Sequence, residues 1–330
     1  MNPYVGQADG SPCPTVVLDR RQLPEDATEL AAELAAVRDR CRSDRWAGAM
    51  KIALISPSAN PLYDLDYRFV QSLDPHWTRL DLRGNCGHSM LVAITAATRM
   101  GWVPLYPGAR VRVNVINNGD LVVAEVDQLS QRVAEFTVHL LSTPPRPVAR
   151  VLPTGTPTTV LPTPLGRLDV SFVDWANPYV LVDAADLGAT DRAALFAADP
   201  DLLERFRVVR AHAAELLGWA PEGAFPKIAA LGQYRPGELT VRAVSVPSWH
   251  PSLGLTGACC LAVAAEVAGT VPAMLRDRAG MGPGELVVRT PGGIVRASAV
   301  LIDGTVGWAS VAGKTVPFEE ARAPQVIEVN

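Results

Sequence analysis

Two side chains have the types and positions needed to move protons. Cys86 lies in Arg83-Gly-Asn-Cys-Gly-His88, immediately before an apolar stretch that predicts a helix. A thiol at a helix N-terminus has a lowered pKa and can exchange protons near neutral pH. Lys51 opens an otherwise apolar strand, where a lysine beside a low-dielectric crevice can serve as a general base or clamp a carboxylate. Simpler roles stay open for both: a small buried residue, and a solvated strand end.

Lysine is rare in this chain, which favours a functional role for those that remain. Of 30 basic residues only Lys51, Lys227 and Lys314 are lysines. Lys227 follows Pro226 and opens an apolar strand as Lys51 does, so the same argument applies in weaker form. We expect Lys51 to carry chemistry and Lys227 to be its structural echo in the second half of the chain.

The remaining cysteines and histidines are less informative. Cys259 and Cys260 fall inside an apolar stripe, which favours core packing. His88 falls in the first helical turn after Cys86. His250 lies in a Ser-Trp-His-Pro loop, where contact with a ligand and a hydrogen bond to the loop backbone are equally plausible.

Four helices are expected among many short Val-rich strands. Residues 25–41 and 200–217 are amphipathic and predict surface helices. Residues 87–100 and 257–268 are apolar or small all round, which predicts helices buried on every side. Each buried helix begins at a glycine-bearing turn and ends at a glycine, as a C-cap would.

The order strand with lysine, glycine turn, buried helix and Val-rich strand occurs twice, which indicates an internal duplication. We predict an α+β protein of two pseudo-symmetric domains, each a curved, mostly antiparallel sheet wrapped round one helix. The first domain is expected over residues 1–135, with the C-terminal strand 316–330 as an open candidate for completing it. The second is expected over residues 136–315.

Related by a pseudo-twofold, the two helix N-termini would both face the crevice between the domains. Each offers unpaired N–H groups and the positive end of a dipole, so together they suit a ligand with two negative charges. The N–H groups expected to face it belong to Gly87 and His88, and to Thr256, Gly257 and Ala258. Glycine making tight turns is the simpler explanation for either helix alone.

Composition limits the function further. The 330 residues carry a net charge of −4, which gives no reason to expect nucleic acid or an anionic membrane as partner. There is no secretory signal, no apolar run long enough to span a bilayer and no phosphate-binding glycine motif. Five cysteines without zinc spacing indicate free thiols, and we expect a cytoplasmic protein.

Several motifs, in this order along nearly the whole chain, resemble the PrpF family. They are Lys51-Ile-Ala-Leu-Ile-Ser-Pro-Ser58, Asp64-Leu-Asp-Tyr67, Arg83-Gly-Asn-Cys-Gly87, Leu152-Pro-Thr-Gly155, Val173-Asp-Trp-Ala-Asn-Pro178, Val182-Asp-Ala-Ala-Asp-Leu187, Pro226-Lys-Ile-Ala229 and Leu255-Thr-Gly-Ala-Cys-Cys260. That family includes 2-methylaconitate isomerase, methylitaconate delta-isomerase and oxalomesaconate tautomerase. It belongs to the diaminopimelate epimerase-like fold, which agrees with the duplication.

The resemblance implies cofactor-free and metal-free proton transfer at an allylic carbon next to carboxylates, with Lys51 and Cys86 as the catalytic pair. Which of the two is base and which is acid stays open. The residues expected to bind the substrate are Ser11, Asn85, Gly87, His88, Asn117, Asn177, His250, Thr256, Gly257 and Ala258. The second catalytic thiol of related two-cysteine epimerases is replaced by Gly254 or Leu255, which argues against a two-thiol racemase.

Departures from the family pattern point to a substrate of this chain's own. The N-terminal Gly-Gly-Thr-Ser-Lys motif appears as Asp9-Gly-Ser-Pro-Cys13, without its lysine, and Asn-Cys-Gly-Asn has become Asn-Cys-Gly-His88. We expect an isomerase or tautomerase of a small unsaturated carboxylate, acting as a monomer or homodimer in biosynthesis. A same-fold epimerase or cyclase and a non-catalytic carboxylate binder are the alternatives.

Overall fold

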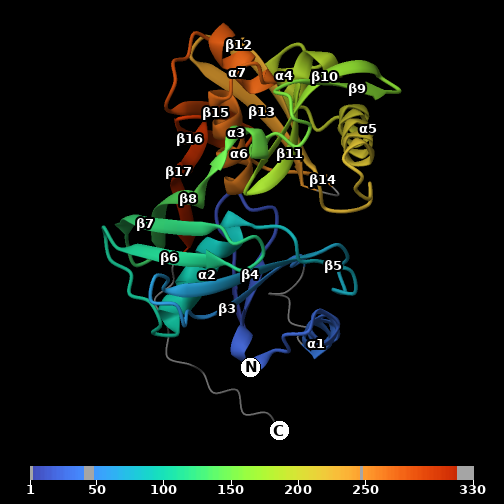
Figure 1. Ribbon diagram of the computed structural model, residues 1–330. Helices are drawn as coiled ribbons and strands as arrows, with labels where there is room; N and C mark the ends of the chain where they lie inside the picture. The colour runs from blue at the N-terminus through green and yellow to red at the C-terminus, as the bar shows by residue number, and fades with distance from the viewer. Residues whose placement is uncertain (1–2, 41–47, 246–247, 318–330) are drawn as a thin grey trace.

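The structure, a computed structural model, describes residues 3–40, 48–245 and 248–317. Two halves lie one above the other (Figure 1). The first half contains β1 (Tyr4–Gly6), β2 (Thr15–Asp19), α1 (Ala27–Arg40), β3 (Lys51–Pro57), β4 (Leu65–Ser72), β5 (Leu80–Asp81), α2 (Gly87–Arg99), β6 (Arg110–Val115), β7 (Leu121–Leu129) and β8 (Val133–Pro147).

The second half repeats this order with a few additions. It contains α3 (Val148–Val151), β9 (Thr159–Thr163), β10 (Gly166–Trp175), β11 (Asn177–Asp183), α4 (Arg192–Phe196), α5 (Pro200–Leu216), β12 (Lys227–Arg235), β13 (Glu238–Ser245), β14 (Ser248–Trp249), α6 (Leu255–Glu266), α7 (Val271–Arg278), β15 (Leu286–Thr290), β16 (Gly293–Ile302) and β17 (Thr305–Pro317). Short 3-10 turns follow β2 and β11.

The strand pairing repeats as well. In the first half β3 is parallel to β2 and antiparallel to β4, and β4 is parallel to β6. In the second half β12 is parallel to β11 and antiparallel to β13, and β13 is parallel to β15. The expected α+β fold of two pseudo-symmetric halves is therefore confirmed.

Two long strands join the halves. β8 pairs with β7 of the first half, and β17 pairs with β16 of the second, while β8 and β17 pair with each other. The expected boundary between residues 135 and 136 thus falls inside β8. The end of β17, from Lys314 to Pro317, pairs with residues 133–136 at the start of β8. Most of the expected closing strand at 316–330 lies outside the described residues.

Both central helices are enclosed by the sheets. Every residue from Gly87 to Ala97 of α2 is buried, and so is every residue from Leu255 to Ala265 of α6. This confirms the prediction drawn from their all-round apolar character. The helix in the second half begins at Leu255, two residues before the start expected from the sequence.

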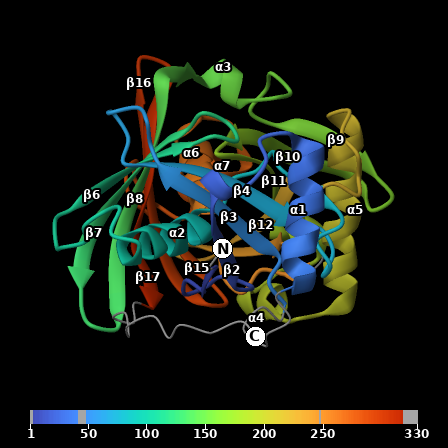
Figure 2. The same cartoon turned by 90° about the horizontal axis from the view of Figure 1, so that it is seen from below.

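The outer faces are covered by the two amphipathic helices, which lie on the same side of the molecule (Figure 2). α1 packs Leu30, Leu34 and Val37 on the apolar residues of β2 and β3. α5 packs its own apolar face on β10, β11 and β12. Each half is thus a buried helix, a sheet and a surface helix, and this layering fixes where the N-termini of α2 and α6 point.

Candidate active site

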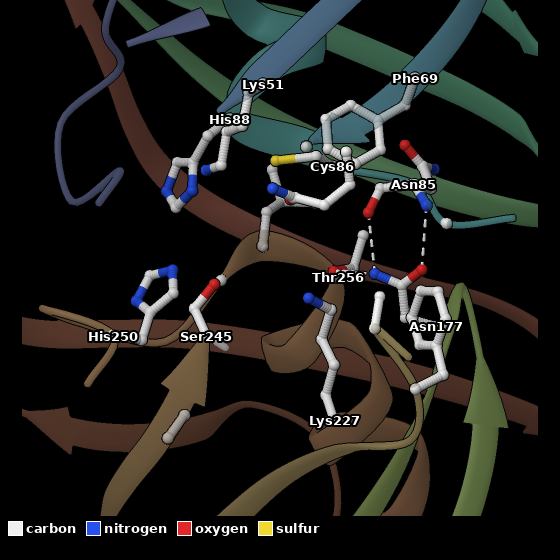
Figure 3. Close-up of a pocket in the computed structure, with 18 of the residues that line it drawn as sticks. Lys51, Phe69, Asn85, Cys86, His88, Asn177, Lys227, Ser245, His250 and Thr256 are labelled. Atoms are coloured by element: carbon white, nitrogen blue, oxygen red, sulfur yellow. Dashed lines mark hydrogen bonds between the residues drawn. The ribbon is translucent and has the colours of Figure 1, made fainter. Parts of the chain in front are cut away.

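A pocket lies where the N-terminus of α2 meets the N-terminus of α6, and its walls come from both halves (Figure 3). The two termini are so close together that a Cβ at Gly87 would lie 2.6 Å from the Leu255 side chain. Glycine is needed at this position for the approach. The pocket therefore places two sets of helix N–H groups and two positive dipole ends around one small volume.

Cys86 is the N-cap of α2 and lines this pocket. Its carbonyl accepts the first helical hydrogen bond from the Met90 N–H (2.9 Å) and another from the Tyr67 hydroxyl (3.0 Å). Burial opposes ionisation of the thiol, but the positive charge of Lys51 and hydrogen bonds from Ser89 outweigh it. The pKa of Cys86 is therefore lowered from its ordinary value.

Lys51 lies beside Cys86 at the start of β3, as Figure 3 shows. The residue is only 4% exposed, and its Nζ donates a hydrogen bond to Ser11 Oγ at 3.0 Å. Ser11 in turn donates to the Cys13 carbonyl at 2.8 Å. Ser11, in the N-terminal loop, therefore positions the Lys51 side chain. It contacts Lys51 and does not line the pocket itself.

Lys227 faces the same pocket from the second half. It opens β12 at the position equivalent to Lys51 in β3, and its Nζ lies 5.5 Å from the centre of the Phe225 ring. Burial lowers the pKa of Lys227 to about 8, with the charge of Cys86 opposing the shift and that of Lys51 adding to it. Lys227, which we expected to be the structural echo of Lys51, thus also lines the pocket, because the pseudo-symmetry that repeats the strand also repeats its direction toward the crevice.

The side-chain amide of Asn85 is polar, buried and unpaired within the described chain. The residue is 3% exposed, and both amide atoms are buried without a hydrogen-bond partner among the described residues. A buried unpaired amide is costly, so its partner is expected in a ligand. Asn85 lines the pocket and stands next to Cys86 in the chain.

Asn177 bridges the two halves. Its amide accepts from the Asn85 backbone N–H (3.0 Å) and donates to the Asn85 carbonyl (2.8 Å) and to Thr256 Oγ1 (2.9 Å). Asn177 and Thr256 line the pocket as expected, but these bonds occupy both amide N–H groups of Asn177. The side chain positions Asn85 and Thr256 relative to each other.

Three expected contacts are placed differently by the structure. The N–H of Ala258 donates to the Gly254 carbonyl at 2.8 Å, because α6 begins earlier than expected, so it has no proton to offer a ligand. Gly257 packs against Tyr179, whose hydroxyl a Cβ would strike. Asn117 bonds the Phe69 backbone in both directions (2.8 Å each) and the Leu82 carbonyl (2.6 Å), and it does not line the pocket.

The two expected histidines meet at one end of the pocket. His88 comes from α2 and His250 from the loop after β14, and their rings stack with centroids 5.9 Å apart. The Ser252 N–H donates to His250 Nδ1 at 3.1 Å, so a neutral His250 carries its hydrogen on Nε2. Burial lowers the pKa of His250 to about 3, with the charges of Lys51, Lys227 and Lys314 adding to the effect.

Further lining residues escaped the sequence reasoning. They are Phe69, Gln71, Asp81, Tyr179, Phe225 and Ser245, among others. Strand register was the signal that could have found two of them, because Gln71 of β4 pairs directly with Lys51 of β3, and Tyr179 of β11 pairs directly with Lys227 of β12. Phe225 lies in a loop whose path depends on the tertiary fold.

The pocket is electropositive. Among the described residues that line the pocket with Lys51 and Lys227, Asp81 is the one acidic group, and it forms an ion pair with Arg83 at 2.7 Å. Burial would raise the pKa of Asp81, but the hydrogen bonds from Arg83 lower it. With two helix N-termini added, the field favours an anionic ligand.

The remaining cysteines, possible metal ligands and apolar helices of the described residues do not add to the site. Cys259 and Cys260 are fully buried and burial raises their pKa values, which confirms core packing. Cys41 lies outside the described residues. No three acidic, histidine or cysteine side chains gather as a metal site would require in the part of the chain that is described. Nor is any single described helix long and apolar enough to cross a membrane, although the bent pair α6 and α7 reaches that length and composition together.

Comparison with known proteins places these observations in a family. The model of the PrpF protein family matches residues 16–312. The chain is 29% identical over 303 residues to 3-methylitaconate isomerase of Eubacterium barkeri, covering 79% of each chain. It is 26% identical over 320 residues to 2-methyl-aconitate isomerase of Shewanella oneidensis, covering 82% of this chain and 79% of that one. The crystal structure of a methylitaconate-delta-isomerase superposes with a TM-score of 0.69 at 24% identity, covering 96% of this chain and 92% of that one.

Proposed function

The chain belongs to the PrpF family, and we therefore propose that it is an isomerase of a small unsaturated carboxylic acid. The enzyme either moves a C=C bond in this acid or tautomerises it. The observation that carries the proposal is the Cys86 thiol, capping α2 beside Lys51 in an electropositive pocket between two helix N-termini. The relatives named 3-methylitaconate isomerase and 2-methyl-aconitate isomerase act on acids of this class by their names.

The proposed reaction is a proton shift along an allyl unit. We assign the base to Cys86, acting as a thiolate, because the positive charge of Lys51 and hydrogen bonds from Ser89 lower the pKa of this thiol against the effect of burial, and we assign the acid to Lys51. The thiolate removes a proton from the allylic carbon, and the C–H electron pair moves into a dienolate. Lys51 then donates a proton at the far end of the allyl unit, and the proton held by Cys86 returns to Lys51 before the next turnover.

The negative charge that develops must be stabilised where it appears. The N–H groups of Gly87 and His88 have no helical acceptor and lie at the positive end of α2. Thr256 occupies the same place in the first turn of α6. Lys227 and the unpaired amide of Asn85 supply further donors to the substrate carboxylates. Such prearranged donors contribute most of their stabilisation as the charge forms.

Both proposed proton carriers come from the first half, so they face one side of a ligand held between the halves. The equivalent of Cys86 in the second half is Gly254, the N-cap of α6, which has no proton to exchange. An epimerase needs carriers on opposite sides of one carbon. With Lys227 of the second half assigned to binding of a carboxylate, the arrangement favours a shift of the double bond over inversion of a stereocentre.

One chain supplies every residue of this site, so a monomer and a homodimer would both carry it. The reaction needs Cys86 as a free thiol, and we place the protein in the reducing cytoplasm for this reason.

The test is proton NMR in deuterated buffer with a panel of unsaturated mono-, di- and tricarboxylates. The proposal predicts that at least one di- or tricarboxylate gains deuterium at an allylic carbon while its double bond moves. Deuterium entering one stereocentre without movement of the double bond would indicate an epimerase. Binding without any exchange across the panel would indicate a carboxylate-binding protein, and either result contradicts the proposal.

A further inference from the structure

The third lysine of the chain is turned inward by an irregularity in β17. Its pairing with β8 shifts register between Val311 and Lys314, and Gly313 has a left-handed backbone (φ 67°). Ala309 and Val311 point inward before this bulge, and Lys314 and Val316 point inward after it. Without the extra residue Lys314 would face outward, so the bulge re-aims the side chain, as bulges near functional sites often do.

Lys314 has no counter-charge where it points. It is 8% exposed, and no described residue forms a hydrogen bond or ion pair with its Nζ. Burial lowers its pKa to about 8, and the influence of the neighbouring Cys259 thiol in the opposite direction is smaller. A largely buried ammonium group without a counter-charge is suited to pair with a negative ligand.

The charge of Lys314 acts on Cys259 and on the two stacked histidines of the pocket. Its positive charge lowers the pKa of both His88 and His250, together with burial and the charge of Lys51. His88 is 2% exposed, and its Nε2 is buried without a partner among the described residues. The imidazole N–H of His250 on Nε2 is a second donor, and no acidic side chain contributes to the field at either ring.

The N-terminal loop ties this region together. The Asp9 N–H donates to the Thr315 carbonyl at 3.0 Å, next to Lys314. A Cβ at Gly10 would lie 3.8 Å from His88 Nε2 and 3.5 Å from the Ser252 side chain. The loop that lacks the lysine of the family motif thus runs directly over the histidine pair and beside Lys314.

We propose that His88, His250 and Lys314 form a second anion subsite, which binds a carboxylate of the substrate remote from the carbon that exchanges its proton. The proposal rests on the proposed function for the identity of the substrate class. In this arrangement the imidazoles donate hydrogen bonds to the carboxylate, and Lys314 supplies the charge that the N-terminal loop lacks. The subsite selects acids with at least two carboxylates over acids with one.

The experiment compares itaconate, an unsaturated dicarboxylate, with its two monomethyl esters by titration calorimetry at pH 8. Wild type should bind itaconate more tightly than at least one of the esters. In Lys314→Met that preference should fall about 10- to 100-fold, the scale of a charged hydrogen bond, while binding of the ester stays within about 3-fold. His88→Gln should reduce the same preference. Arg132→Met, which removes an exposed charge on the surface, is the matched control and should change neither value.

Repeating the titrations in HEPES and in Tris measures the number of protons taken up on binding. This number should not change if Lys314 has only a structural role. An anion beside Lys314 raises the pKa of its ammonium group, so wild type should take up part of a proton on binding itaconate at pH 8. Lys314→Met should take up less. An unchanged preference and unchanged uptake in both variants overturns the subsite, as does failure of wild type to prefer itaconate. If the protein exchanges no allylic protons but still prefers itaconate over its monomethyl esters, only the proposed function is contradicted.

Discussion

The two halves of this protein share a strand order, a central helix and a lysine, yet they differ where each central helix begins. The N-cap of α2 is Cys86 and the N-cap of α6 is Gly254. Lys51 and Lys227 open equivalent strands and both face the pocket. The repeated fold thus forms a symmetric site for an anion, and the single thiol makes that site asymmetric in its chemistry.

The lysines differ in their surroundings as well. Lys51 is bonded to Ser11 of the N-terminal loop, while Lys227 lies against the Phe225 ring. The partner of Lys51 across the sheet is Gln71, and Ser245 lies at the equivalent end of β13. We therefore assign proton transfer to Lys51 in the first half and binding of a carboxylate to Lys227 in the second.

Removing the thiol should have the largest effect. Cys86→Ala should lower the rate of allylic deuterium exchange at least about 100-fold, because it deletes a general base. Cys259→Ala is the matched control, since that thiol is buried in the core, and should leave the rate within about 3-fold. Both rates follow from NMR in deuterated buffer. Equal rates in the two variants would remove the asymmetry on which the comparison depends.

Removing each lysine in turn should separate chemistry from binding. Lys51→Met should lower kcat by about 100-fold or more, whereas Lys227→Met should chiefly raise KM, by about 10-fold or more. Steady-state kinetics on the substrate found by NMR gives both values. A fall in kcat of equal size in both variants would mean that the second half also transfers protons.

The smallest expected effect is on the acidity of Cys86. Its pKa is lowered by Lys51 and, to a smaller extent, by Lys227, against the opposing effect of burial. The rate of alkylation by iodoacetamide should therefore rise with pH at lower values than for an ordinary thiol. Loss of either positive charge destabilises the thiolate, so the profile should move to higher pH, further in Lys51→Met than in Lys227→Met. The opposite order would place Lys227 as the closer partner of the thiol.

Much of the fold could be predicted from local patterns. The all-round apolar character of residues 87–100 and 257–268 identified both central helices, and the repeated order of elements identified the two halves. Position alone marked Cys86 at a helix start and Lys51 at a strand start as candidates, and the resemblance to the PrpF family placed the two in one site.

The remaining site residues depend on details that periodicity does not contain. The start of α6 at Leu255 decides that the Ala258 N–H is used inside the helix. Asn117 binds backbone groups of a strand and a loop that are close only in the folded chain. The direction of Lys314 depends on a single extra residue in β17, and such a bulge reverses which face a side chain occupies.

The central claim is that both proton carriers lie on one side of the substrate. The most direct measurement is the stereochemical course of one turnover in deuterated buffer, using a substrate with a stereospecifically deuterated allylic carbon and NMR to locate the hydrogens lost and gained. The account predicts that the proton leaves and the deuteron arrives on the same face of the allyl unit. Transfer to opposite faces would contradict it, because it would require a proton carrier in the second half, where Gly254 takes the place of the thiol and Lys227 would have to carry the proton.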